Sequence, residues 1–356
     1  MKEIREALAF DDVMMVPTYT EVSSRSIPDL STNIAGISLK IPIISSPMDC
    51  VTESGMAILL GRLGGIGIIH RFMSPEDQIA NLSCVAVVEE FHNRKIPKVA
   101  AIGVGLDELD RFRKLNDAIE LDAIAIDIAN GHSLFMREMI GRVKEISKDI
   151  RVIAGNVATG KGFTYLAESG ANAIRVAIGG GSICKTRIQT GFGVPSFQST
   201  CDAYAAKQSN IKYKDVSIIT DGGIRYPGDF VKSIAAGADA IMCGKILAAT
   251  EESPAKIVFD EIAGIYSKVY RGAASAEIQN EKRGGLKQGT CAEGVQTLLP
   301  LGGSAFEIIE EFCGGLRSGM TYCNARTLQE LRDNAEFVRI TSAGMLESHA
   351  FGTRKE

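Results

Sequence analysis

The sequence predicts an α/β protein built on a (β/α)8 barrel. Eight short apolar runs rich in Ile, Val and Ala recur along the chain, and segments with helical patterning lie between them. Runs that are apolar on both faces, rather than alternating, are typical of buried parallel strands. The alternative, an open doubly wound sheet, usually has fewer strands and a G-x-G-x-x-G sequence after the first strand, which is absent. We therefore expect a closed barrel.

The order of the elements supports this interpretation. Helix-like stretches at 74–91, 107–115, 134–146 and 228–237 alternate with the apolar runs, and Ser74 is a plausible N-cap followed by acidic residues. The eight strands are expected at residues 41–46, 65–70, 99–104, 123–127, 151–156, 173–177, 217–223 and 240–244.

Three regions lie outside the alternation, in what we expect to be a single barrel domain over residues 1–356. Residues 10–35 precede the first strand and should cover the base or edge of the barrel. Residues 268–300 contain a polar, Gly-rich stretch of 22 residues, which predicts a structureless lid or active-site flap. Residues 301–356 should form two C-terminal helices, near 304–313 and 327–336, and a tail with a short strand at 337–340.

Composition excludes several function classes. The 356 residues include 39 Lys and Arg against 43 Asp and Glu, with no long basic block, so nucleic acid is not an expected partner. The eight Cys form no C-x-x-C pair and, with four His, show no zinc-ligand spacing. The first residues have no apolar signal core, and no window approaches about 18 uninterrupted apolar residues. We expect reduced thiols, no membrane span and a cytoplasmic location.

Barrel enzymes place their reacting groups on loops that follow the carboxyl ends of strands. Asp127 stands at such a strand end, where it is either a functional carboxylate or a helix N-cap. The other polar or sulfur-bearing residues at such positions are Ser46, Met48, Arg71, Asn130 and Asn156.

The loop after the sixth strand is the most informative segment. Its glycines, Gly179 to Gly181, allow close backbone approach, and such a loop can present N–H groups to a phosphate or C=O groups to a monovalent cation. Cys184 lies on this polar loop, beside Lys185 and Arg187. It is either a nucleophile with a lowered pKa or an inert thiol.

The loops after the seventh and eighth strands are a common phosphate site in barrels. Gly222 and Gly223 suit that role, although they could equally serve only to make a tight turn. Asp221 is better placed to accept hydrogen bonds from sugar hydroxyls. Lys245, beside Gly244, is either a charge contact for the phosphate or an ordinary solvated side chain.

Several longer motifs, in order over nearly the whole chain, carry a family resemblance. They include FDDVMMVP (10–17), SSPMDCVTE (45–53), GGGSICKTR (179–187), TDGGIR (220–225) and YRGAAS (270–275). These motifs resemble those of the inosine monophosphate dehydrogenase and guanosine monophosphate reductase family. The resemblance implies a homotetrameric barrel enzyme that binds a purine nucleotide monophosphate and uses a nicotinamide cofactor, with K+ as a possible further ligand.

The resemblance also implies roles for single residues. Cys184 would attack C2 of the purine, with Thr186, Glu293, Asp127 and Arg71 as further catalytic groups. Backbone carbonyls of Gly179, Gly181 and Cys184 would hold the monovalent cation. The cofactor would lie against Asp127, Ala129, Asn130, Gly131 and Ser275. The substrate would be held by Ser46, Met48, Asn156, Ser182, Asp221, Gly222, Gly223, Gly244, Lys245, Tyr270, Gly272 and Ala273.

The two family reactions share the covalent adduct but differ in its fate. A dehydrogenase passes hydride to NAD+ and hydrolyses the adduct with a water-activating Arg-Tyr pair on the flap. A reductase expels the C2 amino group as ammonia and takes hydride from NADPH, which gives inosine monophosphate. Thr186 and Glu293 would handle the proton of the departing nitrogen, unless Glu293 is only an exposed loop acid.

Three features favour the reductase. Residues 276–300 contain no Arg-Tyr pair, the spacing from Gly272 to Gly294 is short, and IDIANGHS (126–133) is close to the reductase pattern. Only 28 residues separate the second and third strands, so the regulatory CBS insert common in dehydrogenases is missing. Other segments, at 45–53, 64–70, 193–195 and 338–349, look more like the dehydrogenase. We expect NADPH-dependent reductive deamination of GMP to IMP, with NAD+-dependent IMP dehydrogenation as the alternative.

Overall fold

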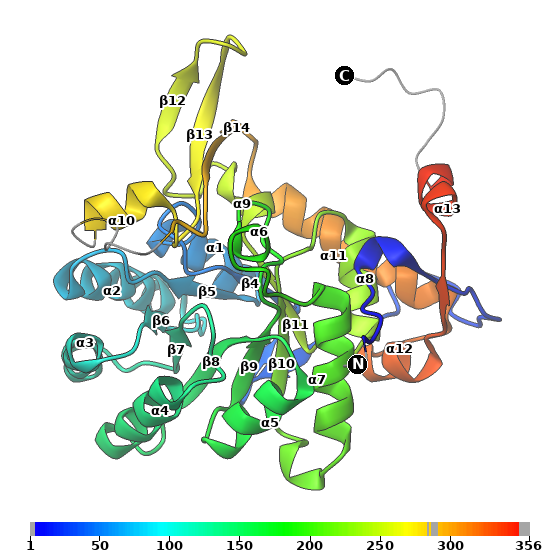
Figure 1. Cartoon of the computed structure of the whole chain (residues 1–356), viewed down its shortest axis with the longest axis horizontal. Coiled ribbons are helices and arrows are strands. Elements are labelled where there is room, and N and C mark those ends of the chain that lie inside the picture. The colour runs from blue at the N-terminus through cyan, green and yellow to red at the C-terminus, as the bar shows by residue number, and fades with distance from the viewer. Residues whose placement is uncertain (1–3, 283–284, 286–290, 349–356) are drawn as a thin grey trace.

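The computed structural model describes residues 4–282, 285 and 291–348, and it confirms the barrel. Eight parallel strands close in the order β10-β11-β4-β5-β6-β7-β8-β9 (Figure 1). Each expected apolar run holds one strand. The strands are β4 (Ile43–Ser45), β5 (Ile66–Ile69), β6 (Val99–Ile102), β7 (Ala123–Asp127), β8 (Arg151–Val157), β9 (Ala173–Val176), β10 (Ser217–Asp221) and β11 (Ala240–Cys243).

Helices between the strands form the outer layer (Figure 1). Between β5 and β6 the chain forms only α2 and short turns, so no further domain is inserted there. These helices are α1 (Ser54–Leu63), α2 (Pro75–His92), α3 (Leu106–Ala118), α4 (Leu134–Ile146), α5 (Gly160–Glu168), α7 (Ser196–Gln208) and α8 (Pro227–Ala235). Two shorter helices, α6 (Thr186–Thr190) and α9 (Lys245–Ala248), follow β9 and β11.

Ser74 caps α2 as the sequence predicts. Its Oγ accepts the Asp77 N–H at 3.0 Å and donates to the Asp77 carboxylate at 2.7 Å. We expect Ser74→Ala to lower the free energy of unfolding by about 1 kcal/mol, because this removes the cap of an exposed helix end. Urea unfolding checks this, with Ser83→Ala in the middle of the same helix as the matched control. Equal midpoints for the two variants would contradict the capping role.

The barrel interior is a packed layer of aliphatic side chains. Alternate residues of each strand point inward, and the others face the helices. The hairpin of β2 (Thr32–Ile34) and β3 (Ile37–Leu39) closes the amino-terminal end with Ile34 and Leu39, which confirms the role expected for residues 10–35. The inner layer comprises Ile44, Ile66, Ile68, Val99, Ala101, Ala123, Ala125, Ile153, Ala173, Ile219, Ala240 and Met242.

Segments near the two ends of the chain pair on one side of the barrel. β1 (Val13–Met15) pairs antiparallel with β15 (Phe337–Arg339), the short strand expected in the tail. The predicted C-terminal helices are present as α11 (Ala305–Tyr322) and α12 (Leu328–Asn334), and both pack against α8. Within the described part of the chain, no helix is long and apolar enough to cross a membrane.

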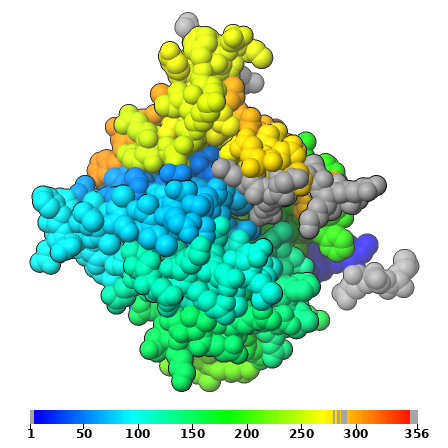
Figure 2. Space-filling view, turned by 90° about the vertical axis from the view of Figure 1, so that its left-hand side faces the viewer, coloured from blue at the N-terminus to red at the C-terminus, as the bar shows by residue number. Residues whose placement is uncertain are grey.

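The expectation of a structureless run within residues 268–300 is wrong for the described part of that run, because residues 276–282 form a helix. Residues 283, 284 and 286–290 of the run lie outside the described residues. This segment, called the flap below, contains the end of β13 (Ile265–Arg271), the helix α10 (Ala276–Lys282) and β14 (Gln296–Pro300). β13 pairs on both sides, with β12 (Ile257–Asp260) and β14, so the backbone polar groups of β13 are satisfied by pairing. The β12–β13 hairpin projects from the body of the molecule (Figures 1 and 2).

Candidate active site

Two adjoining cavities open at the carboxyl end of the barrel strands. The first, of about 290 Å³, lies between the Cys184 loop, the flap and the ends of β7 to β9. The second, of about 550 Å³, lies against the loops after β10 and β11. Both are lined by Ser46, Met48, Gly180, Gly181, Asp221 and Tyr270, so the cavities share one wall.

Cys184 lines the first cavity and is connected to the flap through hydrogen bonds. Its Sγ lies 3.1 Å from Thr186 Oγ1, and Thr186 donates to Glu293 Oε2 at 2.7 Å. The backbones meet at the same place, because Lys185 N–H donates to Glu293 C=O at 2.6 Å. Glu293 is half-buried and bonded rather than an exposed loop acid. Thiol, hydroxyl and carboxylate therefore form one continuous chain.

The remaining cysteines differ from Cys184 in their surroundings. Burial raises the pKa of the Cys50 thiol to about 12 and that of Cys313 to about 11, so both stay protonated at neutral pH. Cys84 and Cys291 are exposed and line neither cavity. Cys184 is thus the thiol that faces the cavity, among the cysteines of the described chain.

An arginine that sequence reasoning missed connects the two strand-end carboxylates. Arg175, on β9, donates to Asp127 at 2.6 Å and to Asp221 at 2.7 Å. Burial opposes the charge of Arg175, but the two carboxylates outweigh it and raise its pKa. Gly155 makes room for this side chain, because a Cβ there would lie 2.5 Å from Arg175 Cβ. The signal was a charged residue inside an otherwise apolar strand.

Asp127 is not a helix cap. Ser133 caps α4, where its Oγ accepts the Met136 N–H, and Asp127 is the inward-facing last residue of β7. Asn156 completes the polar wall with a hydrogen bond from its Nδ2 to Asp221 at 2.7 Å. Asp127 and Asp221 therefore flank Arg175 at the mouth of the barrel.

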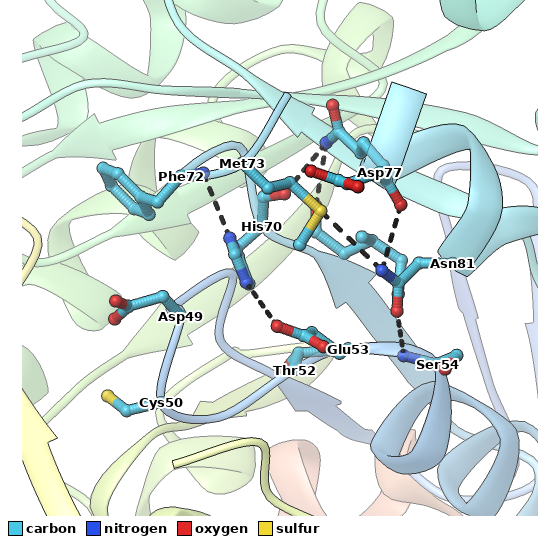
Figure 3. A network of polar contacts seen from close by, with 12 residues as sticks. Asp49, Cys50, Thr52, Glu53, Ser54, His70, Phe72, Met73, Asp77 and Asn81 are labelled. Atoms are coloured by element: carbon cyan, nitrogen blue, oxygen red, sulfur yellow. Dashed lines mark hydrogen bonds and ion pairs between the residues drawn. The ribbon is translucent and has the colours of Figure 1, made fainter. Parts of the chain in front are cut away.

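A network around His70 fixes the turn that carries Arg71 (Figure 3). His70 Nδ1 accepts the Phe72 N–H at 3.0 Å, which leaves His70 Nε2 to donate to Glu53 at 3.2 Å. Arg71, between them in sequence, lines the first cavity and donates to the Asp127 carbonyl at 3.3 Å. The imidazole thus acts as a backbone brace behind the cavity.

The second cavity has the close backbone approach that a phosphate needs. Gly222 and Gly223 have left-handed φ values of 87° and 86°, so they form a tight turn and line the cavity at the same time. A Cβ on Gly244 would lie 3.2 Å from the Tyr270 hydroxyl. Burial raises the pKa of Tyr270, opposed by its hydrogen bond with Ser182. Lys245 is exposed and lines the rim.

The structure places most of the remaining predicted residues around the same cavities and three outside them. Asn130 is exposed, Gly131 donates its N–H to the Asn156 carbonyl at 2.7 Å, and buried Ser275 accepts the Ile278 N–H at the start of α10. Those that line the first cavity are Ala129, Gly179, Gly272 and Ala273.

Comparison with known proteins identifies the chain as a (β/α)8-barrel oxidoreductase. A family model described as IMP dehydrogenase / GMP reductase domain matches residues 7–351, so the chain belongs to this family. The family reactions use a nicotinamide cofactor.

The similar proteins include both IMP dehydrogenases and a GMP reductase. The chain is 33% identical to inosine-5'-monophosphate dehydrogenase of Aquifex aeolicus over 477 positions, covering 98% of this chain and 96% of the relative. It is 36% identical to the dehydrogenase of Cryptosporidium parvum over 399 positions, with 98% and 96% covered. A solved GMP reductase variant of Trypanosoma brucei, in complex with guanosine 5'-monophosphate, matches with a TM-score of 0.90 and 26% identity over 99% of each chain.

Proposed function

We propose that the protein catalyses the NADPH-dependent reductive deamination of GMP to IMP and ammonia. The observation that carries this proposal is the Cys184–Thr186–Glu293 chain, formed with a flap whose residues 276–300 contain no Arg-Tyr pair. A reductase must protect its covalent adduct from water, so a flap without that pair suits the reductase. The likeness to a GMP reductase that binds GMP supports the same choice.

The two cavities suggest the orientation in which the nucleotide would bind. Its 5′-phosphate would lie among Ser182, Gly223, Gly244 and Tyr270, which all line the second cavity. The ribose hydroxyls would donate to Asp221, which Arg175 holds in place. Remaining substrate contacts would come from Ser46, Met48, Asn156, Gly222, Lys245, Gly272 and Ala273. The purine would then extend into the first cavity, with C2 toward Cys184.

The hydrogen bonds already run in the direction that the chemistry needs. The Cys184 thiol donates to Thr186, and Thr186 donates to Glu293. As sulfur attacks C2, the thiol proton would pass through Thr186 to Glu293. Glu293 would return a proton to the nitrogen as the C2–N bond breaks, so that ammonia leaves and a thioimidate remains on Cys184.

The open side of the first cavity fits a nicotinamide. Ile128 and Ala129 form an apolar edge beside Arg71, and Asp127 Oδ2 has no partner within the described part of the chain, which leaves it available to a ribose hydroxyl. When bound, the cofactor supplies hydride to C2, and Cys184 leaves as thiolate. Asn130, Gly131 and Ser275 would support this side from outside the cavity.

A monovalent cation, K+ by preference, would be held by backbone carbonyls of Gly179, Gly181 and Cys184. The loop geometry fits such a ligand in one respect, because Gly179 has a left-handed φ of 77° that turns the backbone sharply. The Gly181 carbonyl accepts the Cys184 N–H at 3.1 Å and keeps a second lone pair. The cation would order the loop rather than react.

IMP dehydrogenation with NAD+ is the second candidate, because the curated relatives at 33% and 36% identity are dehydrogenases. Paired assays separate the two. We expect absorbance of reduced nicotinamide to fall with GMP plus NADPH, and to stay flat with IMP plus NAD+. NADH formation from IMP, with no reaction of GMP, would overturn the proposal.

A Tyr270 variant tests whether the substrate phosphate binds in the second cavity. We expect Tyr270→Phe to raise the KM for GMP about tenfold, because it removes one hydrogen bond to a charged group. Tyr266→Phe is the matched control, since Tyr266 lies on the same strand and is 63% exposed. An unchanged KM in Tyr270→Phe would place the phosphate elsewhere.

We also propose a homotetramer in the cytoplasm. Exposed apolar side chains on the β12–β13 hairpin, including Phe259, Ile262 and Tyr266, support a subunit contact there. Sedimentation of the purified protein tests the stoichiometry, with a tetramer expected and a monomer at micromolar concentration contradicting it.

A further inference from the structure

The loop that carries Cys184 closes on itself at a narrow neck. Ile178 and Val194 form an isolated antiparallel bridge, so residues 178–194 leave the barrel and return at one point. Cys184 and α6 lie between these two ends. Whatever holds the neck closed therefore also restrains the position of the thiol.

Arg187 spans this neck. Its side chain runs back from α6, where Nε donates to the Ile178 carbonyl at 3.2 Å and an Nη donates to the Val194 carbonyl at 2.7 Å. The two acceptors lie on opposite sides of the neck. A planar guanidinium presents donors in two fixed directions, whereas the ammonium of lysine is a single point charge.

Two glycines of the loop are packed against Arg187. A Cβ on Gly179 would lie 2.6 Å from Arg187 Cγ, and one on Gly193 would lie 2.5 Å from the same atom. Both glycines also have φ values, +77° and +153°, that disfavour other residues. The stem of Arg187 thus fills a slot that only glycine backbones leave open, which fixes its course.

The contacts of Arg187 differ from those expected of a charge that activates the nearby Cys184 thiol. Its hydrogen bonds within the described chain go to backbone carbonyls, and no described carboxylate lies within ion-pair distance of it. Burial lowers the pKa of Arg187, while the nearby Cys184 thiolate opposes that shift. The guanidinium remains charged at all ordinary pH values, so its geometry rather than its titration matters.

We propose that Arg187 is a positioning residue, which closes the neck of the Cys184 loop and thereby holds Sγ against Thr186, the hydrogen-bond donor to Glu293. This inference rests on the proposed function for the role of the Cys184 thiol. The proposed role requires that Arg187 donate hydrogen bonds in both directions, so a positive charge alone cannot perform it. An alternative in which Arg187 acts only by lowering the pKa of Cys184 makes a different prediction for lysine.

The test compares Arg187→Lys and Arg187→Ala with Lys185→Gln, which removes an exposed charge next to the nucleophile and leaves the neck intact. We expect both Arg187 variants to lower kcat at least tenfold, with the KM for GMP within about threefold. Added guanidinium should restore part of the kcat of Arg187→Ala and should not change the kcat of Lys185→Gln. Retention of near wild-type kcat by Arg187→Lys would overturn the proposal.

A second readout does not depend on turnover. Alkylation of Cys184 by iodoacetamide, followed by peptide mass spectrometry to exclude Cys84 and Cys291, gives the pH midpoint and limiting rate of the thiol. We expect Arg187→Lys to keep the midpoint within about 0.3 pH units but change the limiting rate at least threefold. A shifted midpoint with an unchanged limiting rate would show that Arg187 acts through charge.

Gly193→Ala perturbs the same neck without replacing Arg187 itself. Its new Cβ would displace the Arg187 stem, so we expect the kcat loss and altered alkylation rate of the Arg187 variants. Normal values in a folded Gly193→Ala protein would contradict the packing. If the wild-type protein oxidises IMP instead of reducing GMP, the alkylation results still decide the role of Arg187, while the proposed function fails separately.

Discussion

Replacing Cys184 by alanine is expected to lower turnover at least about a thousandfold, because loss of the covalent route removes roughly 4 kcal/mol of transition-state stabilisation. Binding of GMP should change less than about threefold, since the phosphate and ribose contacts lie on other loops. Steady-state assays and calorimetric titration measure the two quantities. Cys84→Ala, an exposed thiol on α2, is the control and should behave as wild type.

The outcome separates covalent from purely electrostatic catalysis. If Cys184→Ala kept more than about a hundredth of wild-type turnover, the thiol could not be the nucleophile, because side reactions without it should be far slower. If it lost turnover and GMP binding together, Cys184 would instead be a structural part of the loop.

Glu293→Gln is expected to reduce ammonia release at least about a hundredfold, because an amide cannot return a proton to the departing nitrogen. Hydride transfer should slow less than about tenfold, since that step needs no proton from Glu293. Direct ammonia measurement reports the first step. The reverse half-reaction from IMP and NADP+, followed by the reduced nicotinamide, reports the second.

Glu277→Gln is the matched control, because Glu277 lies on the same flap in the first turn of α10. It should leave both steps unchanged. Unchanged ammonia release in Glu293→Gln would remove Glu293 from the proton path, and equal losses in both steps would make it a general support of the loop rather than an acid.

The barrel could be predicted because buried parallel strands leave a direct pattern. Strands covered on both faces must be apolar throughout, as in AIAID (123–127), and the polar residue that ends such a run marks the mouth of the barrel. This pattern predicts that Asp127 and Asp221, which end β7 and β10, lie at the same end of the barrel. Cys184 was found from the opposite signal, a thiol among glycines and charges.

What escaped prediction depends on partners far away in sequence. Arg175 lies inside an apolar run of the sequence. Its role depends on contacts with Asp127 and Asp221, which the closed barrel brings beside it. The hairpin at 257–271 has apolar residues such as Ile257 and Phe259, but these side chains are exposed rather than packed in the barrel, and its register comes from pairing. In the sequence Arg187 is only a charge near Cys184, whereas its contacts are backbone carbonyls that the fold brings together.

The central claim is that the Cys184 adduct loses ammonia and accepts hydride instead of water. Incubation of the protein with GMP and NADPH that carries deuterium at the transferable position tests it most directly. The account predicts IMP with one deuterium at C2 and one ammonia for each IMP formed. IMP without deuterium, or no reaction of GMP while IMP and NAD+ in ¹⁸O-labelled water give xanthosine monophosphate carrying ¹⁸O, would contradict it.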